Sequence, residues 1–430
     1  MSITRRITFR LYPSPSQVKA LSYWRRLHKD LYNAAIANRK NQYKHFKKSV
    51  DYYEQQNCLP EFKEVWYEYK QLGSHALQAT LKRVDMAFQR FFKGLGGYPK
   101  FKLIRHYSGW TYPCIAGWKA LTNGKNGHLE LSNLGKIQMR GKARTWGKPT
   151  TCTIVNRQGL WYASITVQCN PVRETSTGAV GLDFGCLTAV AMSDGSIVEN
   201  PRYLAATQAK IKLASKSKRR KTKPDFKQKI KASKQWKKAN KKVNKLQRKA
   251  SNQRSNWVHQ VAAEIVSCNS LVATEKLNIK AMTRKAKSGS KREMRHRGYS
   301  PWSLSRKSQK TGLNRSILDV GMGMLRSAIE YKLSEAGGVF VEVPTVKIKP
   351  SQTCPKCGSQ KKKELSERIH NCPCGFTCDR DVAAAMVMLN WAMGTGTDLI
   401  KRGLDSSTST YCGGFKQLSE MKRQKPRPSS

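Results

Sequence analysis

Five cysteines lie close together near the C-terminal end of the chain, and their spacing restricts the fold more than any other feature of the sequence. Two residues separate Cys354 from Cys357, and fourteen residues separate this pair from the tighter pair Cys372 and Cys374. A glycine follows each pair and lets backbone amides turn toward sulfur, as in zinc ribbons. Four thiolates favour tetrahedral zinc and leave no open position for catalysis. The pattern predicts a structural zinc ribbon within residues 349–378.

The identity of one zinc ligand is not decided by the spacing, because Cys378 follows the second pair closely. The second pair is one residue tighter than the common C-x-x-C pair, so Cys378 is an alternative to Cys372 or Cys374. The other seven cysteines are scattered singly, which is typical of reduced thiols.

No stretch approaches the roughly 18 apolar residues of a membrane helix, and no signal-peptide pattern follows Met1. We therefore expect a cytoplasmic protein, in the cytosol or nucleoid of a bacterium, with no membrane partner.

The charge of the chain indicates its class of partner. There are 81 Lys and Arg residues against 27 Asp and Glu residues, which gives a net charge of +54. Because 39% of the residues are apolar, the chain can bury real cores and is not a disordered basic tail. Self-repulsion in a folded polycation is usually offset by a polyanion, and nucleic acid is a more frequent polyanion than acidic lipid.

Residues 210–254 carry twenty basic side chains, and Asp225 is the only acid among them. Sparse apolar positions such as Trp236 and Val243 predict a mostly solvated helical pair. A charge run is often no more than a solvated face, but positive charge without compensating acids favours contact with a phosphate backbone. The candidate nucleic-acid-binding residues are Lys218, Arg219, Arg220, Lys237, Lys238, Lys241, Lys242, Arg248 and Arg254.

The first part of the chain predicts helices followed by strands. Ser14, Pro15 and Gln17 form a helix-start pattern, with a capping Ser, Pro at the first helical position and Gln three residues after the cap. Residues 98–167 alternate as strands do, and a hairpin turn is predicted at 156–159. Aromatic and basic residues interleave at 101–112, where base stacking and the filling of a small barrel are equally good explanations.

The second part predicts an α/β domain. Short apolar runs predict strands at 179–183, 187–192, 196–198, 270–275 and 339–343, and helical spacing predicts one helix over 317–333. Residues 283–312 lack apolar periodicity and predict a mobile loop, and the segment beyond residue 403 predicts a disordered tail.

Acids are scarce in this chain and are therefore informative where they follow apolar strands. Asp183 ends one such strand, Glu275 ends another, and Asp379 and Asp381 open a helix. Carboxylates that lie close together repel one another and raise one another's pKa. A bound divalent metal ion would compensate this repulsion, so the acids predict a metal site. Two Mg²⁺ ions about 4 Å apart can activate water and stabilise the leaving oxygen of a phosphodiester.

The motifs together resemble the transposon-encoded TnpB (OrfB) family, compact RNA-guided nucleases related to the type V CRISPR effectors. The resemblance covers roughly residues 1–395. The matching motifs are VGLDFG at 180–185, SDG at 193–195, NQR at 252–254, TEKLN at 274–278, LNRSILD at 313–319, SQTC at 351–354 and DRD at 379–381.

The resemblance implies a multidomain α+β protein: an RNase H-like (RuvC) α/β nuclease domain with a zinc-ribbon insert, an OB-like β-barrel (wedge) and a helical recognition lobe. The implied domains are 1–13 for the first barrel strand, 14–97 for the helical lobe, 98–175 for the rest of the barrel, 176–348 for the first part of the nuclease domain including the basic pair 210–254, 349–378 for the zinc ribbon, 379–400 for the final nuclease helix and 401–430 for a disordered tail.

The resemblance also implies an activity and its residues. Asp183, Glu275 and Asp381 match the family's catalytic, magnesium-binding carboxylates, and Cys354, Cys357, Cys372 and Cys374 would hold zinc. Asp381 matches rather than Asp379, because the family's last acid stands in an Asp-x-Asn-Ala pattern. Here Ala383 replaces that Asn, and the basic segment between Met282 and Asn314 is longer than the family's lid. The expected partners are a guide RNA from the transposon end and double-stranded target DNA.

The leading expectation is an RNA-guided, Mg²⁺-dependent DNA endonuclease that cuts beside a short adjacent motif. The alternative is a nuclease-dead, RNA-guided DNA-binding protein that regulates transcription or transposition, and Ala383 is the residue that favours it. A structural RNA-binding protein of ribosomal type explains the charge and the zinc but not the acids at strand ends. A strand-joining transposase would share the metal chemistry, and only the resemblance argues against it.

Overall fold

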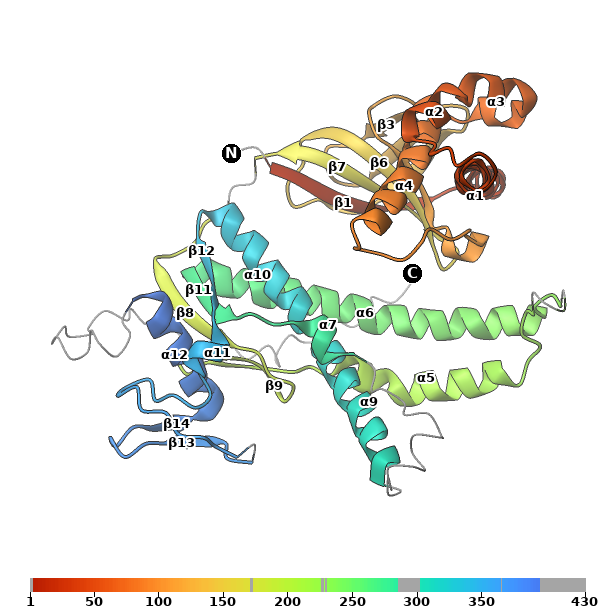
Figure 1. The fold of residues 1–430 in the computed structure, drawn as a ribbon. Helices are drawn as coiled ribbons and strands as arrows, with labels where there is room; N and C mark the ends of the chain where they lie inside the picture. Colours follow the sequence, from red (N-terminus) through yellow and green to blue (C-terminus); the bar gives the residue numbers. More distant parts are fainter. Residues whose placement is uncertain are drawn as a thin grey trace, which may run out of the picture. The chain divides into compact units, whose positions relative to one another are not determined.

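The computed structural model describes residues 3–170, 173–225, 228, 230–284, 302–364 and 366–394. The predicted tail at 401–430 and residues 285–301 of the predicted loop lie outside the described residues. The chain divides into two compact units, Met1–Pro171 and Val172–Ser430, and each is described by itself (Figure 1). No described helix is long and apolar enough to cross a membrane.

A seven-stranded antiparallel sheet forms the base of the first unit, in the order β2-β6-β7-β1-β5-β4-β3. The predicted hairpin is confirmed, because β6 and β7 pair up to Arg157 opposite Leu160. Gln158 and Gly159 between them both take positive φ, 54° and 82°, as a two-residue turn matched to strand twist requires. The strands are β1 (Ile3–Tyr12), β2 (Gly109–Tyr112), β3 (Trp118–Leu121), β4 (Gly127–Leu131), β5 (Gly135–Arg140), β6 (Lys148–Arg157) and β7 (Leu160–Cys169).

Helices pack on this sheet and share its core. The predicted helix start is confirmed: the Ser14 hydroxyl accepts from the Gln17 amide, and the Gln17 side chain accepts from the Ser14 amide. His28 of the first helix stacks on Trp110 of β2 at 5.2 Å between ring centres. The helices are α1 (Pro15–Phe46), α2 (Tyr52–Asn57), α3 (Leu59–Val65) and α4 (Ser74–Phe92), with 3₁₀ turns η1 (Tyr67–Gln71) and η2 (Ile104–His106).

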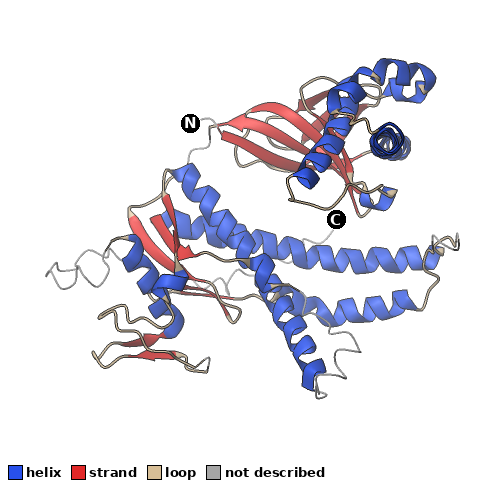
Figure 2. Cartoon of the chain, in the orientation of Figure 1, coloured by secondary structure: helices blue, strands red, loops and turns tan. Residues whose placement is uncertain are grey.

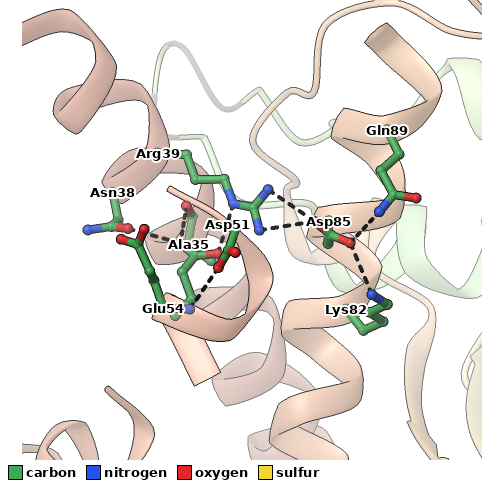
Figure 3. A network of polar contacts seen from close by, with 9 residues as sticks. Ala35, Asn38, Arg39, Asp51, Glu54, Lys82, Asp85 and Gln89 are labelled. Atoms are coloured by element: carbon green, nitrogen blue, oxygen red, sulfur yellow. Dashed lines mark hydrogen bonds and ion pairs between the residues drawn. The ribbon is translucent and has the colours of Figure 1, made fainter. Parts of the chain in front are cut away.

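A buried ion pair ties the helices of the first unit together (Figure 3). The two terminal nitrogens of the Arg39 guanidinium on α1 lie 3.4 Å from one Asp85 oxygen on α4, while its Nε donates to Gln55 on α2 at 2.9 Å. The other Asp85 oxygen accepts from Gln89 and Lys82 at 2.8 and 3.2 Å. A buried carboxylate needs this number of donors, and removal of one partner would leave an uncompensated charge.

The second unit is built on a five-stranded sheet in the order β10-β9-β8-β11-β12. β8 (Gly178–Asp183), β11 (Asn269–Glu275) and β12 (Val339–Val343) are parallel, whereas β9 (Thr188–Met192) and β10 (Ile197–Glu199) are antiparallel additions. All five were predicted from short apolar runs. The three parallel strands bring their carboxyl ends to one edge of the sheet.

Helices cover both faces of this sheet (Figure 2). Val180 and Val272 share one core with Trp257 and Leu325 of two long helices, while Ala273 on the opposite face packs with Met388 of the last helix. The helices are α5 (Tyr203–Arg219), α6 (Lys234–Cys268), α7 (Ile279–Met282), α9 (Trp302–Val320), α10 (Met322–Ala336), α11 (Thr345–Ile348) and α12 (Arg380–Ala392). α5 and α6 lie side by side and form the predicted basic pair (Figure 1).

Two predictions for this unit are wrong in detail. The single helix predicted over 317–333 is broken at Gly321, whose φ of 77° ends α9 and begins α10. The apolar spacing continues across the break, so periodicity alone did not reveal it. The loop predicted over 283–312 is helical from Trp302 onward. This segment is rich in serine, lysine, arginine and glutamine, which a helix tolerates, but it lacks the apolar stripe by which a sequence indicates a helix.

Candidate active site and metal centre

Two predicted site acids meet at the carboxyl edge of the second sheet. Asp183 is the last residue of β8 and Glu275 is the last residue of β11. The two strands are parallel neighbours with Thr274 opposite Leu182, so the acids that follow are adjacent across the ladder. Gly181 and Ala273 face α12, and each acid lies two residues farther along its strand. Because side chains two residues apart on a strand share a face, both acids belong to the face that α12 covers.

The third acid arrives on α12, which lies in backbone contact with β8. A Cβ atom on Gly181 would be 1.9 Å from the Ala385 carbonyl oxygen, so only glycine permits this approach. Asp379 caps the helix and accepts from the backbone amides of Asp381 and Val382 at 2.8 and 3.2 Å. The capping role of Asp379 leaves Asp381, in the first turn, as the acid available to the site.

The pKa of Asp183 responds to both of the other acids. Burial, together with the negative charges of Glu275 and Asp381, raises it from 3.8 to about 7, and the positive charge of Arg380 partly offsets this rise. Burial also raises the pKa of Glu275. The charges of the three predicted carboxylates therefore influence one another, although their oxygens do not lie within 4.8 Å of one another as a group.

Arg380 is a site residue that sequence reasoning missed. Its guanidinium Nε lies 3.7 Å from an Asp381 oxygen, and its Nη1 donates to the Glu364 carbonyl of the cysteine-bearing segment at 3.1 Å. Its amide donates to the Arg368 carbonyl at 2.8 Å. The position between Asp379 and Asp381 was visible in the sequence, but nothing there showed that one cation serves both the acids and the neighbouring segment.

The four predicted thiolates gather into one cluster. Sγ of Cys354 lies 3.7 Å from Sγ of Cys374, and Sγ of Cys357 lies 3.5 Å from Sγ of Cys372. Four sulfurs at about 2.3 Å from a tetrahedral zinc ion are about 3.8 Å apart, so the cluster has the size that zinc requires. Across the described part of the chain, it is the only group of three or more His, Cys, Asp or Glu side chains with all ligand atoms within 4.8 Å of one another.

Cys378 is not a member of the cluster. It lies on β14 (Thr377–Asp379), which pairs with β13 (Ile369–Asn371), and its thiol donates to the Asp379 carbonyl at 3.2 Å. The structure therefore favours Cys372 and Cys374 as the second ligand pair. Ser359, which sequence reasoning missed, places its hydroxyl 3.2 and 3.3 Å from two of the sulfurs, where it can donate to thiolates.

Most of the predicted nucleic-acid-binding residues are exposed on α5 and α6. Lys218 crosses between the two helices, donates to Asn240 at 3.3 Å and lies 5.7 Å from the Trp236 ring centre. Arg254 differs from the others, because it donates to the Leu318 carbonyl and packs beneath Gly321. The structure thus gives Arg254 a role in joining α6 to α9. The exposed members are Arg219, Arg220, Lys237, Lys238, Lys241 and Lys242.

Three family models match the chain in order. A helix-turn-helix domain of IS605-type OrfB proteins matches residues 1–48, the OrfB model described as a probable transposase matches 162–286, and the Cas12f1-like TNB domain matches 323–388. The last model spans both the cysteine cluster and the start of α12.

Two relatives are similar over most of their length. A putative RNA-guided DNA endonuclease, InsQ, of Escherichia coli K12 is 27% identical over 84% of this chain and 85% of its own. A putative RNA-guided DNA endonuclease of Streptomyces pristinaespiralis is 26% identical over 90% of this chain and 89% of its own.

Solved structures of two complexes also match, with a similarity too low to establish a shared fold. A Cas12f1–sgRNA–target DNA complex matches 90% of this chain and 99% of its own at 14% identity and a TM-score of 0.31. A CRISPR-Cas12f ternary complex matches 87% of this chain and 81% of its own at 13% identity and a TM-score of 0.30.

Proposed function

We propose that the activity of this protein is RNA-guided, Mg²⁺-dependent cleavage of DNA. The chain belongs to the OrfB family of transposon-encoded proteins. The proposal is supported by Asp183 and Glu275 at the ends of neighbouring parallel strands and by Asp381 on the helix packed against β8, with burial and the charges of the other two acids raising the pKa of Asp183. The names of the two relatives supply the substrate class. The family was identified correctly from the sequence motifs.

The carboxylates fit a divalent cation on chemical grounds. Hard oxygen ligands are those that Mg²⁺ prefers, and a buried acid with a raised pKa beside two other acids lacks compensating positive charge. Asp183, Glu275 and Asp381 would hold the metal, and two ions are the expected number. When bound, such ions stabilise negative charge on a phosphodiester and lower the pKa of a water molecule.

The residues of the chain position this chemistry. The β8–β11 ladder fixes the spacing of Asp183 and Glu275, and the contact between Gly181 and α12 fixes Asp381 against them. Arg380 holds the start of α12 to the zinc-ribbon segment and lends positive charge to the acids. The thiolate cluster, with zinc bound by Cys354, Cys357, Cys372 and Cys374, would keep this segment folded.

The proposed domains follow from the same assignment. The five-stranded sheet with α6, α10 and α12 is proposed as the RuvC-like, RNase H-type nuclease domain, which the zinc ribbon interrupts between β12 and α12. The seven-stranded sheet is proposed as the OB-like wedge, and α1 to α4 as the recognition lobe. The net charge of +54 supports permanent binding of a guide RNA, which would pair with one strand of double-stranded target DNA.

The decisive experiment is to express the protein with the DNA that flanks its gene, purify the complex, and sequence the bound RNA. The complex is then incubated with targets that carry randomised flanks, in Mg²⁺. One abundant RNA ending in a guide, with cleaved targets that share an adjacent motif, is the expected result. Targets that are bound by the parent but remain uncut would contradict the nuclease.

Bound, uncut targets would favour the nuclease-dead binder, for which Ala383 is the specific observation. Ala383 is buried on α12, two residues after Asp381 and where the family pattern has Asn. An Ala383→Asn variant would then be tested for cleavage in the same assay. Gain of cleavage in that variant would assign the loss of activity to this one position.

A further inference from the structure

A groove of about 650 Å³ lies between α5 and α6, away from the carboxylates. Its volume falls within the roughly 300–1,000 Å³ of sites that hold small organic ligands. The floor is apolar and includes Leu213 and Ala214 of α5 together with Ala239 and Leu246 of α6. Lys218, which bonds Asn240 across the helix pair, braces the two helices at this level. The groove is therefore part of how these two helices pack.

The rim of the groove is positively charged. Lys210 and Lys216 of α5, Arg220 and Lys221 just after α5, and Lys242 of α6 line it, and none of its ten lining residues is acidic. An apolar floor with a ring of cations matches a ligand that has a flat apolar part and flanking negative charges. An unpaired nucleotide has this form, with its base between two phosphates. A nucleotide within a duplex does not have this form, because its base is stacked and paired.

The helix α6, which lines the groove, also carries Arg254, and Arg254 lies near the chain segment that follows Glu275. Gly321 lies against Arg254 of α6, and Gly323 lies against Ile279, four residues beyond Glu275. Arg254 is therefore beside the chain segment that leaves the site. Lys242 precedes Arg254 by twelve residues, which is about 18 Å along a helix. A DNA strand that passes Arg254 could therefore reach the groove within a few nucleotides.

We propose that the groove between α5 and α6 binds one unpaired nucleotide of the DNA strand that passes the carboxylate site. The base lies on Leu213, Ala214, Ala239 and Leu246, and the cations of the rim contact its phosphates. Binding would hold the strand in register and keep it from pairing again. The inference rests on the proposed function, because it takes the carboxylates as the place where DNA is cut.

A fluorescent base tests this inference directly. Target DNA with a single 2-aminopurine, moved one position at a time along either strand, is added to the guide complex in a buffer that contains no Mg²⁺ and no chelator, so that DNA binds without cleavage. 2-Aminopurine is bright where it is unstacked. One or two adjacent positions in one DNA strand are expected to be several-fold brighter than their neighbours.

A substitution that fills the groove gives the matched comparison. Ser217 lines the groove and is exposed, so Ser217→Trp occupies it without a change in charge. Ala209 is exposed on the same helix and does not line the groove, so Ala209→Trp is the control. Ser217→Trp is expected to abolish the bright position and Ala209→Trp to preserve it. Neither substitution changes the charge of the chain, so a difference between the two variants cannot come from charge.

The outcomes separate this inference from the nuclease proposal. A parent complex that cuts DNA in Mg²⁺ but shows no bright position overturns the groove assignment, as does a bright position that survives Ser217→Trp. A bright position found only with labelled guide RNA overturns the choice of occupant. A parent complex that never cuts, yet shows a bright DNA position sensitive to Ser217→Trp, contradicts the nuclease and supports the groove.

Discussion

Asp183 is the residue for which folding and the proposed chemistry favour different protonation states. Burial and two neighbouring acids raise its pKa to about 7, whereas metal binding requires the ionised carboxylate. Replacement with a neutral residue should therefore abolish cleavage while it leaves the basic surfaces of the protein unchanged. We expect Asp183→Ala to lose cleavage by several orders of magnitude and to bind guide and target within a few-fold of the parent, measured side by side in the target assay. Cleavage at the parent rate would remove Asp183 from the site.

The same residue predicts an unusual pH dependence of stability. Because the folded-state pKa lies above the ordinary 3.8, the metal-free fold keeps a proton that the unfolded chain releases. The contribution is fully present below the ordinary value and is lost as pH rises through about 7. Asp183→Asn removes the buried charge, so at about pH 8 its melting temperature should exceed that of the parent by roughly 2–4 °C for each kcal/mol gained.

Two controls belong to this melting experiment. Near pH 3 the parent and Asp183→Asn should melt alike, because the parent carboxyl is then largely protonated in both states. Mg²⁺ added at the higher pH should stabilise the parent more than the variant. A parent that melts higher than the variant at alkaline pH without metal would show that burial of this charge is not the cause.

At the scale of elements, the approach of α12 to β8 determines whether the third acid reaches the site. A Cβ at position 181 would lie 1.9 Å from the Ala385 carbonyl oxygen, so Gly181→Ala must push α12 away from the sheet. Overpacking of this kind costs about 1–3 kcal/mol. We expect a lower free energy of unfolding and a fall in cleavage, measured by denaturant titration and by the target assay.

Gly312→Ala is the matched glycine substitution. Gly312 lies within α9 with no atom near its Cβ position, so alanine should stabilise the helix by about 0.5–1 kcal/mol. Equal effects of the two substitutions on stability would mean that the contact between β8 and α12 is looser than the structure has it.

The cysteine cluster predicts which thiols hold metal. Cys354→Ser removes a member of the quartet, whereas Cys378→Ser removes a thiol that lies outside the quartet and donates to the Asp379 carbonyl. We expect the zinc content per chain, measured by elemental analysis, to fall with Cys354→Ser and to stay at the parent level with Cys378→Ser. The reverse ranking would return Cys378 to the ligand set.

The elements also show what the sequence could and could not predict. The two strand-end acids were predictable, because short apolar runs ended at Asp183 and Glu275 and parallel strands share an edge. The break at Gly321 was not, because a glycine inside a helical pattern has many meanings and only φ of 77° identifies this one. The sequence also could not reveal the double contact of Arg380, since its partners lie on a segment whose path depends on the cysteine cluster.

At the scale of the whole molecule, the excess of positive charges destabilises the fold by mutual repulsion, and added salt weakens this repulsion. At a net charge of +54, raising the salt from about 0.1 M to 1 M shortens the screening length from roughly 10 to 3 Å and weakens repulsion across the fold. The melting temperature of the nucleic-acid-free protein should therefore rise with NaCl, while its affinity for RNA should fall. Equal responses to NaCl and KCl at one ionic strength would identify screening, and a melting temperature that falls with salt would contradict it.

The position of α12 at the end of the described chain sets the order in which the protein is completed during synthesis. The ribosome releases β8, β9, β10, β11 and β12 first, and the face that carries Ala273 stays uncovered until α12 emerges and docks. The nascent chain thus presents its basic helices to nucleic acid well before it has all three acids. A gene interrupted between β12 and α12 would still encode the basic pair, but without Asp381 and without the helix that covers Ala273.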